Sequence, residues 1–82
     1  MKFVVEFRLF PDSNAKVVDV FEAKGPNRTQ GVRFRQAWIG TKSKVAFVVV
    51  ESDSEKLVND AAKAWGDYGG CIIHPVIDIE DF

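Results

Sequence analysis

The spacing of hydrophobic residues changes along the chain in an order that few small folds can satisfy. Stretches in which apolar and polar residues alternate, as in a half-buried strand, are interleaved with stretches whose apolar residues recur at helical spacing. In order, the patterns predict a strand at 2–9, a helix at 14–24, a strand hairpin at 32–39 and 44–51, a helix with its apolar stripe over 57–68, and a strand at 71–80. The predicted order of elements is therefore βαββαβ.

Residues that start or stop secondary structure stand between these stretches. Gly25-Pro26 ends the first helix, because glycine supplies a left-handed cap and proline cannot continue the helix. A polar loop follows over Asn27–Gly31. Ser52 with Glu55 has the spacing of a capping box for the second helix, and Gly69-Gly70 stops that helix.

For a chain of 82 residues, this order predicts one α+β domain of the ferredoxin-like type over residues 1–82. Right-handed crossovers place both helices on one face of a four-stranded antiparallel sheet. The expected spatial order of the strands is fourth, first, third, second.

The other face of the sheet, here called the open face, has no helix to cover it. Side-chain parity along the strands, with no bulge assumed, assigns to it Val4, Glu6, Arg8, Arg33, Arg35, Ala37, Ala46, Val48, Val50, Ile72, His74, Val76 and Asp78. Five of these are branched aliphatics, namely Val4, Val48, Val50, Ile72 and Val76. Such a patch is large for a small monomer, so we predict a homodimer that pairs through the open face. A monomer with a loop folded over the sheet is the alternative, for which the Asn27–Gly31 loop is short.

Several runs of the sequence resemble a bacterial family of unknown function in the dimeric α+β barrel superfamily. These runs are KFVVEF at 2–7, FEAKGPN at 21–27, AWIG at 37–40 and IHPVI at 73–77. The resemblance implies that two ferredoxin-like sheets pack face to face in a homodimer. That superfamily includes cofactor-independent monooxygenases, lactone isomerases and haem-handling enzymes, so the resemblance implies no particular reaction and no particular catalytic residue.

Glu6, Arg8 and His74 form the best candidate for a catalytic cluster. The first and last strands are expected to be neighbours, so an acid, a guanidinium and the only imidazole of the chain converge on the open face. Arg35 adds a cation that can bind an anionic or enolate-like substrate. The alternative is structural: Glu6 and Arg8 pair across the interface and His74 satisfies a hydrogen bond.

Two hypotheses about function follow. In the first, the protein binds a small molecule, or acts as an enzyme without a cofactor, between the paired sheets. The small residues Ala37 and Ala46 then leave space for the substrate, and a pocket is expected beside His74. In the second, the protein is a structural or regulatory module whose useful property is its dimer surface, and its polar residues satisfy one another.

Charge and composition weaken several other classes of function. Eleven basic and twelve acidic residues give a net charge of −1, which leaves no basic excess for nucleic acid. A single cysteine, Cys71, permits no internal disulfide and has no evident catalytic partner. His74 with Asp78 or Glu80 falls short of a metal site, so we predict no metal and no cofactor, with haem on His74 as a third possibility by analogy. No apolar run is long enough for a membrane span, and we expect a cytoplasmic protein.

Overall fold

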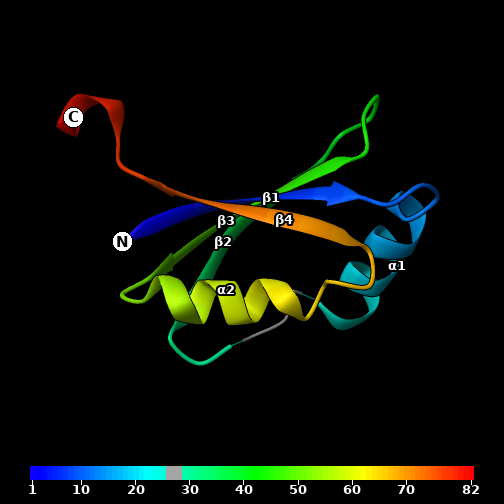
Figure 1. The fold of residues 1–82 in the computed structure, drawn as a ribbon, viewed down its shortest axis with the longest axis horizontal. Helices are drawn as coiled ribbons and strands as arrows, with labels where there is room; N and C mark the ends of the chain where they lie inside the picture. Colours follow the sequence, from blue (N-terminus) through cyan, green and yellow to red (C-terminus); the bar gives the residue numbers. More distant parts are fainter. Residues whose placement is uncertain (26–28) are drawn as a thin grey trace.

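The computed structural model describes residues 1–25 and 29–82, and it has the predicted order of elements (Figure 1). These elements are β1 (Lys2–Leu9), α1 (Asn14–Lys24), β2 (Val32–Ile39), β3 (Val45–Ser52), α2 (Glu55–Lys63), β4 (Gly69–Val76) and a short 3₁₀ helix, η1 (Ile79–Asp81). The predicted helix stop at Pro26 and the start of the polar loop at Asn27 and Arg28 lie outside the described residues.

The strands form one antiparallel sheet in the order β2-β3-β1-β4, which is the predicted spatial order. Helix α2 runs under the sheet and packs against β2, β3 and β4, while α1 lies towards the end of the sheet at which β1 finishes (Figure 1). The ferredoxin-like α+β prediction is confirmed. Strands β2 and β4 are the two edges of the sheet.

The core lies between the sheet and α2, and β1 supplies half of its buried residues. Its alternate residues Phe3, Val5, Phe7 and Leu9 are all buried, and Phe3 is fully enclosed. Val58 of α2 packs against them and is 1% exposed. The period-two pattern of β1 therefore predicted the buried face correctly, because one face of that strand is apolar and the other is mixed.

The boundaries of α2 and β4 differ from the predicted ones. Ser54, rather than Ser52, caps α2, since its Oγ accepts a hydrogen bond from the Leu57 amide at 3.3 Å. Ser52 instead ends β3, and its Oγ accepts a hydrogen bond from the Ser54 amide at 3.1 Å. Strand β4 begins at Gly69, where a side chain would collide with the backbone of Arg8. Close approach of two backbones thus requires glycine there, and the glycine pair opens the strand.

The predicted register of β3 is wrong. Val48 pairs with Val5 and Ala46 pairs with Phe7, so these residues of β3 face the helices together with Val50. Ala46 and Val50 are each 7% exposed. The sequence does not determine this parity, because the run over 45–50 is apolar on both faces and shows no alternation.

The predicted orientation of the second half of β2 is wrong as well. The register shifts between Phe34 and Gln36, which places Arg35 in a β-bulge. The bulge reverses the side-chain parity beyond it. Ala37 therefore faces the helices, which is the opposite of its predicted orientation, and Trp38 faces away from them.

The open face is thereby redefined. It carries Val4, Glu6 and Arg8 of β1, Arg33, Gln36 and Trp38 of β2, Phe47, Val49 and Glu51 of β3, and Ile72, His74 and Val76 of β4. The predicted assignments are confirmed for β1 and for Ile72, His74 and Val76 of β4, since Val4 pairs with His74 and Glu6 with Ile72. Asp78, which was also assigned to the open face, lies beyond the end of β4. This face remains rich in apolar residues, although Phe47 and Val49 replace Val48 and Val50 on β3 and Trp38 is added from β2.

Candidate functional site

The structure brings Glu6, Arg8 and His74 together on the open face, as the sequence predicted. The Glu6 carboxylate accepts a hydrogen bond from Arg8 Nε at 3.0 Å and lies 3.1 Å from His74 Nε2. The Glu6 side chain is the most enclosed of the three, at 19% exposed, against 68% for Arg8 and 47% for His74. Glu6 thus contacts both other members of the cluster.

The electrostatics of the cluster stabilise the charged form of its carboxylate. The hydrogen bond from Arg8, and then that from His74, hold the pKa of Glu6 below its ordinary value. When Nε2 of His74 donates to this carboxylate, Nδ1 is the ring atom left to accept a proton. The arrangement can therefore present a fixed imidazole base, or can simply satisfy three polar groups on an apolar face.

A row of large apolar side chains crosses the open face on either side of Glu6. Trp38 pairs with Phe47, Phe47 with Glu6, and Glu6 with Ile72, so the row includes one residue from each strand. Trp38 is 51% exposed, and Phe47 and Ile72 are each 38% exposed. These exposed aromatic and aliphatic groups, which lie side by side, form an apolar patch on the open face.

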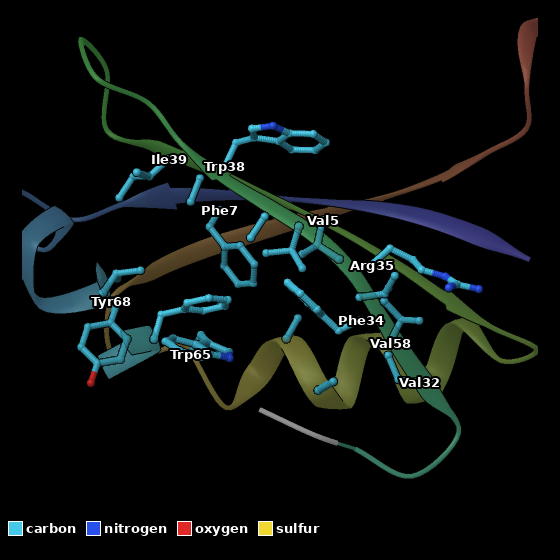
Figure 2. Close-up of a pocket in the computed structure, with 18 of the residues that line it drawn as sticks. Val5, Phe7, Val32, Phe34, Arg35, Trp38, Ile39, Val58, Trp65 and Tyr68 are labelled. Carbon is cyan, nitrogen blue, oxygen red and sulfur yellow. The ribbon is translucent and has the colours of Figure 1, made fainter. Parts of the chain in front are cut away.

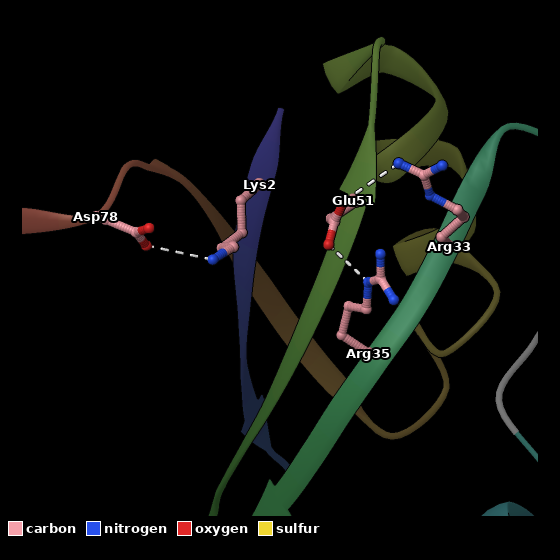
Figure 3. A network of polar contacts seen from close by, with 5 residues as sticks. All are labelled: Lys2, Arg33, Arg35, Glu51 and Asp78. Carbon is pink, nitrogen blue, oxygen red and sulfur yellow. Dashed lines mark hydrogen bonds and ion pairs between the residues drawn. The ribbon is translucent and has the colours of Figure 1, made fainter. Parts of the chain in front are cut away.

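A second charged group lies at the end of the sheet where β1 begins (Figure 3). Glu51 accepts hydrogen bonds from Arg35 Nε at 2.6 Å and from Arg33 at 3.2 Å, and Lys2 pairs with Asp78 at 3.3 Å. The hydrogen bond from Arg35 lowers the pKa of Glu51, and the same contact raises the pKa of Arg35. Arg35, predicted to bind substrate, is thus already engaged with a carboxylate.

A large cavity lies on the other side of the sheet, between the sheet and the helices (Figure 2). Its volume is 650 Å³, and most of its lining is apolar. Phe7 and Phe34 border it from the sheet, and Val58, Trp65 and Tyr68 border it from the α2 side. Trp38 is among the lining residues too, but in Figure 2 its ring lies on the other side of the sheet from Phe7 and Trp65.

The three predicted substrate-binding residues, Arg35, Ala37 and Ala46, are all among the residues that line this cavity. Glu6, Arg8 and His74 do not belong to its lining, and the sheet separates them from it. The cavity therefore lies on the opposite side of the sheet from His74, where the pocket was expected. Within one copy, the polar cluster and the cavity are two separate features.

Trp65 and Tyr68 belong to the apolar stripe over 57–68 that the sequence predicted. Their rings lie 5.9 Å apart, and both line the cavity. Phe34 also lines it, with its ring 5.8 Å from that of Phe21 on α1. Helical spacing showed that the two aromatics after α2 face inward, but no sequence signal showed that the space before them is unfilled.

Other features of the described residues bear on the remaining predictions. Cys71 is free and partly buried, and it packs against the core. Among residues 1–25 and 29–82, no group of three or more histidine, cysteine or acidic side chains gathers at one point. In the same part of the chain, no helix combines the length and the apolar character that crossing a membrane requires.

Together these features define a class: a ferredoxin-like α+β domain with a bare, partly polar sheet face and an apolar cavity under its helices. The comparison with family models then assigns the chain more narrowly. It belongs to the family described as "Domain of unknown function (DUF3303)", whose model matches residues 1–82. No curated protein and no solved structure matches the chain.

Proposed function

We propose that the protein binds a small, predominantly apolar molecule in the cavity between its sheet and its helices. The observation that carries this proposal is the 650 Å³ of open space lined by apolar side chains. Protein interiors are normally packed with few voids larger than a water molecule. Ligand pockets, in contrast, have volumes of about 300–1,000 Å³ and mainly hydrophobic and aromatic linings.

The chemistry of the lining favours a ligand with a ring or a branched hydrocarbon body. Phe7, Phe34 and Trp65 present aromatic surfaces to the cavity, and Val58 adds an aliphatic wall. Tyr68 also belongs to the lining, and so do the charged residues Glu22, Arg33 and Arg35. Hydrophobic burial therefore supplies most of the affinity, and the polar groups of the lining can orient the ligand.

We also propose that two copies pair through their open faces, in the manner of the dimeric α+β barrel superfamily. The observation that favours this is the exposed row of Trp38, Phe47 and Ile72. Pairing would enclose Glu6 and His74 between the copies, with the carboxylate already satisfied by its neighbours. Catalysis by His74 stays a prediction that concerns this enclosed space, not the cavity under the helices.

Ligand binding is tested with N-phenyl-1-naphthylamine, a neutral apolar fluorophore. The protein carries a Trp38→Phe substitution, so that Trp65, which lines the cavity, is the remaining tryptophan. We expect probe fluorescence to rise on binding and Trp65 emission to fall through energy transfer. Saturation at one probe per chain supports the proposal.

The matched variants are Ala61→Phe and Ala23→Phe. Ala61 lines the cavity, whereas Ala23 is exposed on α1 and lies outside the lining. Ala61→Phe should abolish the energy transfer, and Ala23→Phe should leave it unchanged. The proposal is wrong if the probe fails to bind, or if both variants bind it as the parent does.

A further inference from the structure

The segment after β4, residues 77–82, runs away from the body of the protein (Figure 1). Its apolar side chains have no place in the core of their own copy: Ile77 is 63% exposed, Ile79 is 90% exposed and Phe82 is fully exposed. The residues between them are acidic, namely Asp78, Glu80 and Asp81. Half of the segment is the 3₁₀ helix η1, and a segment that is both apolar and acidic is complementary to a surface that is apolar and basic.

Strand β2, at the opposite edge of the sheet, has such a surface. Arg33 and Arg35 share the single carboxylate of Glu51 (Figure 3), so the three side chains together carry a net charge of +1. Phe34, between the two arginines, is 38% exposed on the other face of the strand. A segment lying along an edge strand can contact side chains from both of its faces.

The register places the acidic segment and the basic strand at the same end of the sheet. Arg33 pairs with Glu51, Glu51 with Lys2, and Lys2 with Val76, the last residue of β4. The two features thus share one end of the sheet but lie on opposite edges. Within one copy they cannot meet without crossing the open face.

Face-to-face pairing resolves this separation. A two-fold axis that runs along the strands, between two open faces, exchanges the edges of the sheet and preserves its ends. It therefore brings the end of β4 in one copy to the Arg33 end of β2 in the other. Covering an exposed edge strand in this way is one of the means by which natural sheets avoid unwanted pairing.

We propose that residues 77–82 of one copy lie along β2 of a second copy, with Glu80 and Asp81 facing Arg33 and Arg35. The apolar members of the segment cover Phe34 in this arrangement. The inference rests on the proposed pairing of open faces. It adds that residues 77–82, here called the arm, contact the other copy, and that the two-fold axis runs along the strands. Each copy gives one arm and receives one, so two such contacts form per dimer.

Charge inversion tests the contact with two complementary variants. The strand variant is Arg33→Glu, Arg35→Glu and Glu51→Lys, which keeps the local ion pairs but inverts their net sign. The arm variant is Glu80→Lys and Asp81→Lys, which leaves the Lys2–Asp78 pair in place. In the homodimer of either variant, both arm contacts join like charges. In a heterodimer of the two variants, both contacts join opposite charges.

Sedimentation and native mass spectrometry supply the measurements. We expect each variant alone to dissociate about tenfold more readily than the wild type, or more, since like charges now face each other. An equimolar mixture should form heterodimers with the wild-type dissociation constant. Circular dichroism verifies that each variant is folded. Lys42→Glu with Lys44→Glu, in the hairpin at the other end of the sheet, is the control and should dimerise as the wild type does.

The outcomes separate the arm from the pairing itself. A wild-type protein that stays monomeric at all concentrations overturns both the pairing of open faces and the contact of residues 77–82 with β2. A dimeric wild type whose variants keep the wild-type dissociation constant overturns the arm alone. Variants that are weakened but gain nothing from mixing also overturn it, because the charges then do not meet across copies.

Discussion

The substitution Ala61→Leu extends a side chain from α2 into the cavity between the helices and the sheet. Leucine adds three carbon atoms to alanine, and burial contributes about 0.8 kcal/mol per methylene, or about 2.4 kcal/mol in total. Ordering the longer side chain costs about 0.5–1 kcal/mol, and leucine is nearly as good a helix former as alanine. The expected net gain in the free energy of unfolding is about 1.5 kcal/mol.

Thermal and denaturant unfolding measure this gain. For a domain of this size, about 1.5 kcal/mol corresponds to a rise in Tm of about 6–12 °C. Ala23→Leu, at an exposed position of α1, is the control and should change stability by less than about 0.5 kcal/mol. In a fully packed interior, the same Ala61→Leu change would destabilise by about 1–3 kcal/mol. A loss of that size would refute the claim that the space is open.

Three further predictions concern the core, the polar cluster and the open face. Phe3→Ala should lower the free energy of unfolding by about 3–5 kcal/mol in urea titrations, because Phe3 is fully buried. The folded-state pKa of Glu6 lies below its ordinary value of 4.5, so its stabilising contribution is present above about that pH and is lost as the pH falls through the folded pKa. Glu6→Gln should therefore be less stable than the wild type at pH 7, and acid unfolding curves should show the difference shrinking at low pH. Trp38→Ser with Phe47→Ser should raise the dimer dissociation constant about 100-fold or more in light scattering while leaving a folded monomer; an unchanged constant would place the interface elsewhere.

The fold was predictable because several local signals agreed. The alternation in β1 identified the buried side of that strand, and the pairing of β1 with β4 then placed His74 beside Glu6. Two short-range features, a period-two pattern and a right-handed crossover, were sufficient to bring together residues 68 positions apart. The polar cluster is the part of the candidate site that sequence reasoning located correctly.

The cavity was not predictable, for two physical reasons. The apolar run over 45–50 carries no alternation, so it gives no information about which face Ala46 occupies. The bulge at Arg35 has no glycine or other marker in the sequence, yet it reverses Ala37 and Trp38. Empty space is moreover a property of how α1, α2 and the sheet pack, and no single segment encodes it.

The most direct test of ligand binding is a methyl NMR titration with N-phenyl-1-naphthylamine, since it identifies which face of the sheet the probe contacts. Val48, Val50 and Val58 border the cavity, whereas Val4, Val49 and Val76 belong to the open face. We predict that the methyl resonances of Val48, Val50 and Val58 shift on titration and that those of Val4, Val49 and Val76 do not. Shifts confined to Val4, Val49 and Val76 would place the ligand on the open face beside His74 and would contradict the proposed site.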